Sequence, residues 1–325
     1  MADVLALHDR VGVVAIGRNE GARLARCLAS LPASRLRTAY VDSGSTDGSP
    51  DLARDAGAQV ISLDMTIAFS AARGRNAGWR WLAANSPGIE FIQFVDGDCE
   101  IEDGWLQTGL AFLDTNPAVA VVCGRRRERF PERSFYNQIC DEEWDTPIGP
   151  AAACGGDSLI RLSILNQIDG FDPALMAGEE PEMCSRIRAL GHQVWRLDQP
   201  MTIHDAAMTR FRQWWLRAVR SGLGYAQAWQ ATARGSRLYA TELRRALFWA
   251  GAVPLAAIVL AGVLGPAFLL LAPAAWAVQI ARLSPRLGLR KAALLTVGKA
   301  AELAGMAIWL RRRLFGGAQR VVDYK

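Results

Sequence analysis

The sequence lacks the cysteine spacings that would indicate a disulfide framework or a zinc site. Its six cysteines are scattered between Cys27 and Cys184, and no two of them form a CxxC pair. Cysteines placed in this way are typical of reduced, mostly buried thiols in the cytosol. The N-terminus also lacks a basic stretch ahead of its first apolar run at 11–17, so no signal peptide is predicted.

Acidic residues are nearly absent from the C-terminal part of the chain. Residues 206–325 contain 18 lysines and arginines but only 3 acidic residues, a net charge of +15. Residues 1–205 contain 19 arginines and 29 acidic residues, a net charge of −10. A basic segment indicates either nucleic acid or an anionic membrane surface as its partner.

Charge is missing altogether from residues 246–281, a run of 36 residues with arginines on both sides. A nucleic-acid-binding arm would not contain such a run, so the sequence favours a membrane and predicts no nucleic acid partner. One straight helix of this length would measure about 54 Å, against a hydrocarbon core of roughly 30 Å. A break at Gly265-Pro266 would give a hairpin, transmembrane or re-entrant, with both ends in the cytoplasm. A buried hairpin of a soluble protein is the alternative.

The segments on either side of this hairpin have amphipathic patterns. Residues 206–245 place Phe211, Trp214 and Trp215 on one helical face and arginines on another, which is typical of helices at a membrane interface. Residues 282–325 are predicted to be a basic amphipathic segment.

Residues 1–205 alternate between predicted strands and helices. Four apolar runs with the character of buried strands are separated by helical segments, at 11–16, 38–42, 58–63 and 91–95. This order predicts an α/β domain with a parallel-rich, Rossmann-like sheet. Ligands of such sheets bind at the carboxyl ends of the strands, where Asp42 and Asp96 stand.

Two stretches of this domain allow both a structural and a functional interpretation. Asp96 and Asp98 follow a buried strand directly, and Asp-Gly-Asp is either a plain turn or a ligand-binding carboxylate pair. The stretch 124–133 holds five arginines and is either a solvated loop or an anion site. Its candidate acceptor- or phosphate-binding residues are Arg125, Arg126 and Arg127.

Six stretches between residues 11 and 205 resemble, in order and spacing, the motifs of family 2 glycosyltransferases, which are inverting enzymes of the GT-A fold. They are "VVAIGRNEGARLARCLASL", "YVDSGSTDGSPDLAR", "ARGRNAGWRWL", "FVDGDCEIEDGW", "CGGDSLIRLSILNQIDGFDP" and "AGEEPEMCSRIRALG". The resemblance implies a donor site for a nucleotide sugar, with Asp42, Ser43, Arg75, Asn76 and Asp96 as its residues. It also implies a divalent cation, Mn²⁺ or Mg²⁺, bound by Asp98 and His204, although His204 could equally cap a strand end.

The resemblance places Glu180 at the position of the general base. This is a departure from the family, which usually has aspartate there, so Glu179 or Glu182 could share the role. A base opposite the leaving group gives direct displacement with inversion at the anomeric carbon. The segment "QWWLR" does not match the QxxRW pattern of processive polysaccharide synthases, which argues against that class.

The sequence therefore predicts a metal-dependent glycosyltransferase at the cytoplasmic face of the inner membrane. Its acceptor would be lipid-linked or membrane-embedded, as in bacterial exopolysaccharide or cell-envelope glycan synthesis. Within the class, a polyprenyl-phosphate glycosyltransferase is the alternative. Outside it, a nucleotidyltransferase and a non-catalytic membrane scaffold remain as rivals.

Overall fold

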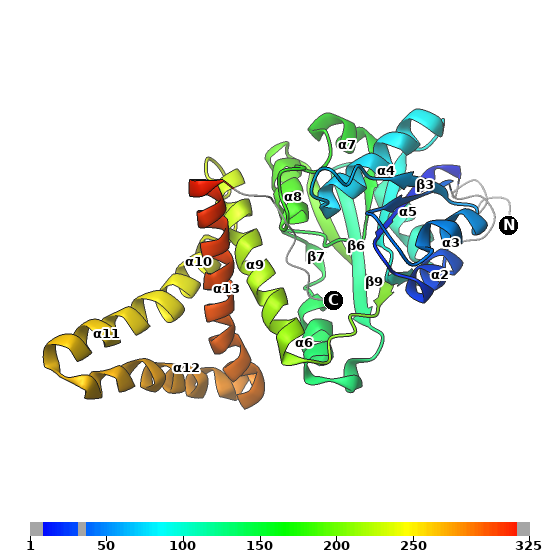
Figure 1. Ribbon diagram of the computed structural model, residues 1–325. Coiled ribbons are helices and arrows are strands. Elements are labelled where there is room, and N and C mark those ends of the chain that lie inside the picture. The colour runs from blue at the N-terminus through cyan, green and yellow to red at the C-terminus, as the bar shows by residue number, and fades with distance from the viewer. Residues whose placement is uncertain (1–8, 32–36, 317–325) are drawn as a thin grey trace. The chain divides into compact units, whose positions relative to one another are not determined.

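The computed structural model describes residues 9–31 and 37–316 (Figure 1). The chain forms two compact units, which meet in the sequence between Thr209 and Arg210. The first contains the sheet, and the second contains helices alone among its described residues. Each unit is described separately below.

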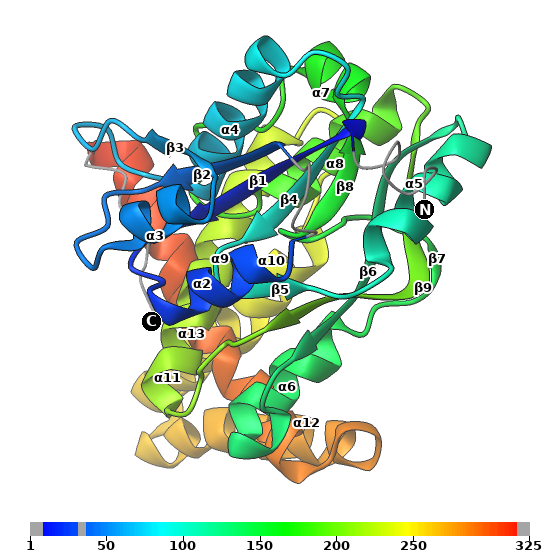
Figure 2. The same ribbon diagram turned by 90° about the vertical axis from the view of Figure 1, so that its right-hand side faces the viewer.

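A nine-stranded sheet forms the centre of the first unit, in the order β3-β2-β1-β4-β8-β6-β9-β5, with β7 paired to β9 (Figure 2). The strands are β1 (Val11–Gly17), β2 (Arg37–Asp42), β3 (Gln59–Ser62), β4 (Phe91–Asp96), β5 (Cys99–Ile101), β6 (Val119–Glu128), β7 (Gly149–Pro150), β8 (Ser158–Arg161) and β9 (Gln193–His204). The α/β domain expected from the sequence is thus present.

The first half of the sheet is parallel because its strands are joined by helices. β1 is a continuous apolar run, and its residues Val11 and Val13 to Ala15 are fully buried, as expected of a strand covered on both faces. The connecting helices are α2 (Ala22–Ala29), α3 (Ser49–Asp55) and α4 (Ala71–Asn85). α4 packs closely on β1 and β2, since a Cβ at Gly78 would lie 2.4 Å from Val14 Cγ1.

The second half of the sheet mixes strand directions, which the expectation of a parallel-rich sheet did not include. β8 runs antiparallel between β4 and β6, and β9 runs parallel to β6 but antiparallel to β5 and β7. The helices of this half are α5 (Trp105–Thr115), α6 (Phe135–Trp144), α7 (Leu162–Ile168) and α8 (Glu179–Ala189), with a short turn η1 (Pro131–Arg133). The pairing of β5 with β9 brings the last residue of β9 beside the Asp-Gly-Asp turn.

The second unit contains three helices that are long and apolar enough to cross a membrane: Ala240–Leu264, Pro266–Leu287 and Leu289–Phe315. Its elements are α9 (Phe211–Ala231), α10 (Ala240–Ala246), the π-helical η2 (Leu247–Ala252), α11 (Val253–Leu264), the 3₁₀ turn η3 (Pro266–Leu270), α12 (Leu271–Leu287) and α13 (Leu289–Phe315). The helix break expected at Gly265-Pro266 lies between α11 and η3. The third helix falls within the segment predicted to be merely basic and amphipathic.

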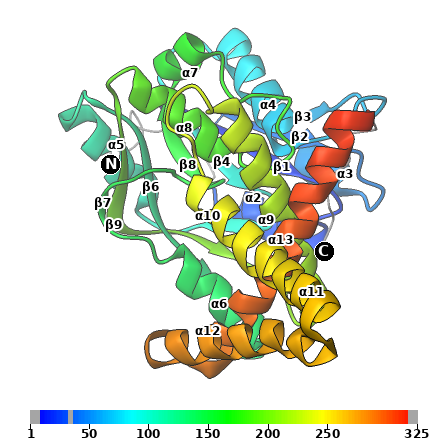
Figure 3. The same cartoon turned by 90° about the vertical axis from the view of Figure 1, so that its left-hand side faces the viewer.

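Helices α9 and α13 lie side by side and pack through glycines (Figure 3). A Cβ at Gly222 would lie 2.0 Å from Glu302 O, and a Cβ at Gly305 would lie 2.0 Å from Val219 O. Small residues allow two helix backbones to approach this closely. Trp214 is buried and its ring meets Gly298 of α13, so part of the face predicted to contact the membrane packs on α13 instead.

Candidate donor and metal site

The candidate site lies at the carboxyl ends of β1, β2 and β4. Strand register places Asp42 beside Gly17 and Asp96 beside Ile16, so the two carboxylates stand on opposite sides of β1. The carboxylate of Asp42 accepts hydrogen bonds from the N–H groups of Gly44 at 3.0 Å and Ser45 at 3.1 Å. Asp42 thereby shapes the loop that follows β2, and Ser43 is buried at the start of that loop.

The Asp-Gly-Asp turn brings Asp98 next to His204. The N–H of Gly97 donates to Ile16 O at 2.8 Å, which holds the turn against β1. Cys99 of β5 pairs with His204 of β9, and His204 Nε2 lies 3.1 Å from Asp98 Oδ2. The two residues predicted to bind a metal are therefore in contact, although 106 positions separate them in the sequence.

The side chains around Asp98 fit a divalent cation. Asp98 and His204 are both buried and offer a carboxylate oxygen and an imidazole nitrogen. Among the residues that the structure describes, His204 Nδ1 has no hydrogen-bond partner although it is buried. Cys99 lies in the same group, but a thiol is a poor ligand for hard cations such as Mg²⁺ and Mn²⁺. Asp98 and His204 would be the ligands.

Arg75 connects the carboxylates of the turn with those of α8. Its guanidinium is buried and forms ion pairs of 2.9 Å with both Asp96 Oδ1 and Glu179 Oε1. Burial would by itself raise the pKa of Asp96, but Arg75 and Arg126 outweigh it and hold that pKa below its ordinary value. Asp96 thus carries its negative charge at neutral pH. Arg75, which was predicted to be a donor-site residue, is held by these carboxylates.

Glu180 is the acid of the α8 N-terminus that remains accessible. Gly178 precedes α8 with φ 80°, a left-handed conformation that favours glycine, and three acids occupy the first turn. Glu179 pairs with Arg75, and Glu182 pairs with Arg186 at 2.8 Å. The side chain of Glu180 is 19% exposed and lies 3.7 Å from Arg75 Nη1. Of the three acids considered for the base, Glu180 has the most suitable position.

The environment of Glu180 also suits a general base. Burial raises the pKa of its carboxyl to about 7, and the neighbouring Glu179 carboxylate adds to the rise while Arg75 opposes it. A base works best when its pKa is near the working pH, because it is then both deprotonated and strongly proton-accepting. The residue has the properties that the predicted role requires.

Asp157 is a residue of the site that the sequence analysis did not identify. It is fully buried, accepts a hydrogen bond from the N–H of Asp96 at 3.0 Å, and pairs with Arg126 at 2.6 Å. The hydroxyl of Thr202 donates to it at 2.7 Å. Asp157 therefore fixes both the start of the Asp-Gly-Asp turn and the arginine beside it. Its position directly after a Gly-Gly pair was the available signal.

The three arginines predicted as an anion site point to different places. Arg126 pairs with Asp96 at 3.2 Å, whereas Arg125 pairs with Asp141 and Arg127 pairs with Glu102. Successive side chains of a strand point to opposite faces, which explains why Arg126 alone of the three reaches the carboxylates. Any anion bound at this site would meet Arg126 and not its two neighbours.

Asn76 makes its hydrogen bonds to protein groups next to the site. Its amide donates to Phe171 O at 2.7 Å and its oxygen accepts from Phe171 N at 2.9 Å and from Trp79 Nε1 at 3.0 Å. With all three bonds made inside the protein and 3% exposure, Asn76 acts on a ligand only through the segment that it holds. The ring of Phe171 lies against the Arg75 guanidinium, 5.6 Å from its centroid.

One aromatic ring borders the two residues that are predicted to bind a metal. The ring of half-buried Trp144 lies 4.8 Å from the His204 ring, centroid to centroid, and the Arg126 guanidinium stands over it at 5.5 Å. Trp144 ends α6, a helix that the sequence analysis did not connect with the site. Aromatic rings of this kind provide apolar contact area beside charged groups.

Comparison with known proteins agrees with this geometry. Residues 13–155 match the sequence model of glycosyl transferase family 2. Glycosyltransferase AglE of Haloferax volcanii is 23% identical over 234 residues, which cover 67% of this chain and 74% of AglE. The pre-mycofactocin glycosyltransferase of Mycobacterium tuberculosis is 27% identical over 227 residues, 66% of this chain but only 46% of that protein. The chain thus spans less than half of this second relative.

A solved structure shows the same fold. The mannosyltransferase PcManGT from Pyrobaculum calidifontis, in complex with GDP-Man and Mn²⁺, superposes with a TM-score of 0.59 at 19% identity, covering 93% of this chain and 87% of that one. The match to glycosyl transferase family 2 and the two named relatives favour a glycosyltransferase over the nucleotidyltransferase. The family match over residues 13–155, the named relatives and the shared architecture together make the sheet unit of this chain similar to family 2 glycosyltransferases of the GT-A fold.

Proposed function

We propose that this chain is an inverting, metal-dependent glycosyltransferase that moves a sugar from a nucleotide diphosphate donor to a lipid-linked or membrane-embedded acceptor. One observation carries the proposal: Arg75 pairs with Asp96 of the Asp-Gly-Asp turn and lies 3.7 Å from Glu180. The candidate base and the candidate cation ligands thus border one site at the sheet edge. The mannosyltransferase PcManGT, which has the same fold, was solved in complex with GDP-Man and Mn²⁺, and this supports this type of donor and cofactor.

The residues of the site have separate tasks in this reaction. Glu180 removes the proton of the acceptor hydroxyl as that oxygen attacks the anomeric carbon from the face opposite the diphosphate. Asp98 and His204 would hold the divalent cation, which when bound would neutralise charge on the leaving diphosphate. Arg75 exchanges carboxylate partners for the diphosphate, and Asp42 and Ser43 bind the nucleoside. A phosphate acceptor, as in polyprenyl-phosphate glycosyltransferases, would need Glu180 less.

The helical unit supports an acceptor at a membrane. Three of its helices are long and apolar enough to cross a bilayer, and residues 206–325 carry a net charge of +15. Basic residues beside apolar helices favour the cytoplasmic side. We place the enzyme at the cytoplasmic face of the inner membrane, with exopolysaccharide or cell-envelope glycan synthesis as its setting.

A donor panel tests the proposal. Purified full-length protein is incubated with UDP-, GDP- and dTDP-sugars, with Mn²⁺, with Mg²⁺ and with a chelator, and nucleoside diphosphate release is measured. Slow release from one donor, dependent on the cation and increased by membrane lipid extract, is expected. Proton NMR of the product should show the anomeric configuration opposite to that of the donor. Cation-independent release, or retention of configuration, would contradict the proposal.

A further inference from the structure

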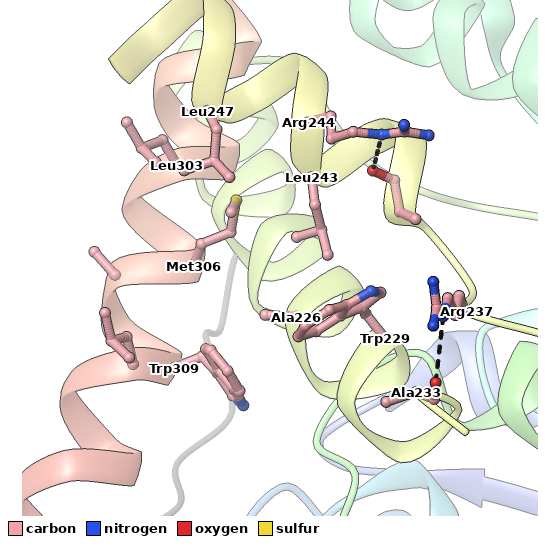
Figure 4. Close-up of a pocket in the computed structure, with 13 residues that line it drawn as sticks. Ala226, Trp229, Ala233, Arg237, Leu243, Arg244, Leu247, Leu303, Met306 and Trp309 are labelled. Carbon is pink, nitrogen blue, oxygen red and sulfur yellow. Dashed lines mark hydrogen bonds between the residues drawn. The ribbon is translucent and has the colours of Figure 1, made fainter. Parts of the chain in front are cut away.

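An apolar pocket lies within the helical unit, and none of the residues that line it has been given a role in the reaction. It has a volume of about 930 Å³, near the upper end of the roughly 300–1,000 Å³ that small-molecule sites occupy (Figure 4). α9, α10 and α13 and the connections between them supply its walls. Leu243, Leu303 and Met306 are among the lining residues, and the rest are mostly alanine, leucine and tryptophan. The chemistry of these walls fits a hydrocarbon chain.

Two arginines give the pocket a charged side. Arg237 and Arg244 line it, and Figure 4 shows both on the side facing away from the α13 residues. Arg237 Nε donates to Ala233 O at 3.4 Å and Arg244 Nε donates to Ala240 O at 3.2 Å. Within residues 9–31 and 37–316, neither guanidinium has a carboxylate partner. Positive charge is therefore available beside an apolar cavity.

The residues that line the pocket stand at the ends of the apolar segments, as expected of a site at a membrane interface. Arg244 stands two residues before the run of 36 uncharged residues, and Leu310 stands directly before Arg311 to Arg313 at the end of α13. Trp229 and Trp309 also line the pocket. Tryptophan and arginine side chains gather where the hydrocarbon of a bilayer meets its headgroups. The apolar part of the pocket would thus lie beside acyl chains and the arginines beside phosphates.

We propose that this pocket binds an anionic glycerophospholipid, with one acyl chain against Leu243, Leu303 and Met306 and its phosphate between Arg237 and Arg244. Arginine is suited to phosphate because its planar guanidinium donates two parallel hydrogen bonds. The excess of basic over acidic residues in the unit selects for anionic over zwitterionic lipid. The proposal concerns the helical unit alone and does not depend on the reaction proposed for the sheet edge.

The test measures lipid binding by the full-length protein in a neutral detergent. Delipidated protein is titrated with phosphatidylglycerol or with phosphatidylcholine of the same acyl chains, and bound lipid is counted by native mass spectrometry. One tightly bound phosphatidylglycerol is expected, with phosphatidylcholine at least about tenfold weaker. The double variant Arg237→Gln/Arg244→Gln should lose this preference. Its matched control is Arg234→Gln/Arg245→Gln, which removes the same charge from neighbouring positions outside the pocket and should keep the preference.

A second variant separates the apolar pocket from the charge. Ala307 lines the pocket and is exposed, so Ala307→Trp fills the cavity without disturbing a buried contact and should weaken both lipids. Equal binding of the two lipids by the wild-type protein would overturn the proposal. So would an equal loss in the control pair, unchanged binding by Ala307→Trp, or binding of an isoprenyl phosphate but of no phosphatidylglycerol. Donor hydrolysis, measured on the same samples, reports separately on the proposed reaction.

Discussion

At the scale of single residues, the site depends on how three acids in one helical turn are divided. Glu179 and Glu182 are neutralised by Arg75 and Arg186, while Glu180 keeps a partly exposed carboxyl with a pKa of about 7. The pattern "GEEPE" does not show which of the three acids stays partly exposed. Arg75 lies far from this pattern in the sequence, and Arg186 lies one helical turn beyond Glu182. The structure makes that choice visible.

The raised pKa predicts the pH dependence of the reaction. The base must be deprotonated, and burial keeps its proton bound up to about pH 7, so kcat/KM should rise with pH and level off above about 7. Glu180→Gln should bind donor normally and lose roughly 10²-fold or more in turnover. Glu182→Gln is the matched control and should keep most of the activity. A rate that falls with rising pH below 7 would contradict the role of Glu180 as a base, and an active Glu180→Gln enzyme would point to a phosphate acceptor.

At the scale of elements, the sequence predicted the strands and helices that have a regular local pattern of apolar residues. The four apolar runs that became β1 to β4 and the helices between them follow from periodicity and turn residues. It did not predict that β8 would insert antiparallel between β4 and β6. Nor did it connect Asp157 with Arg126, since that contact joins residues 31 positions apart through the fold.

The missed third apolar helix has a similar explanation. Residues 289–315 contain arginines, lysines and Glu302, and these suggested a surface segment. In the structure Glu302 pairs with Lys299 at 2.7 Å, and the helix uses its small residues to pack on α9. The charges alone suggested a surface segment, whereas Glu302 is paired with Lys299 one turn away on the same helix.

The contact between α9 and α13 makes a prediction about stability. Gly305→Leu would place side-chain atoms into the α9 backbone at Val219 and should destabilise the helical unit by about 1–3 kcal/mol or more. Gly262→Leu is the matched control, since a Cβ there meets nothing within 4 Å. Thermal unfolding in detergent measures both. The packing argument fails if the two variants unfold at the same temperature as the wild-type protein.

At the scale of the whole molecule, the two ends of the apolar region lie together. Ala240, at the start of the first apolar helix, and Leu310, near the end of the third, line the same pocket. Three separate crossings would put these residues on opposite sides of a bilayer. This arrangement is the one expected if α11 and α12 enter a membrane and return to the same side, and the hairpin stays a prediction.

Cysteine labelling tests this topology directly, because all six native cysteines are buried in the sheet unit. Single variants Ser236→Cys and Leu314→Cys, probed with an impermeant maleimide on sealed vesicles, should react from the same side. Leu264→Cys, at the tip between α11 and η3, should react from the opposite side for a transmembrane hairpin and from neither side for a re-entrant one. Labelling of Ser236→Cys and Leu314→Cys from opposite sides would contradict the hairpin.

The central claim is that the Asp-Gly-Asp turn and His204 form the cation site of a sugar-nucleotide enzyme. Calorimetric titration of UDP and GDP, with and without Mn²⁺, into the wild-type protein and Asp98→Asn measures it most directly. We expect Mn²⁺ to strengthen nucleotide binding to the wild-type protein at least about tenfold. The Asp98→Asn protein, with an unchanged unfolding temperature, should show no such gain. An equal Mn²⁺-dependent gain in both proteins would contradict the account.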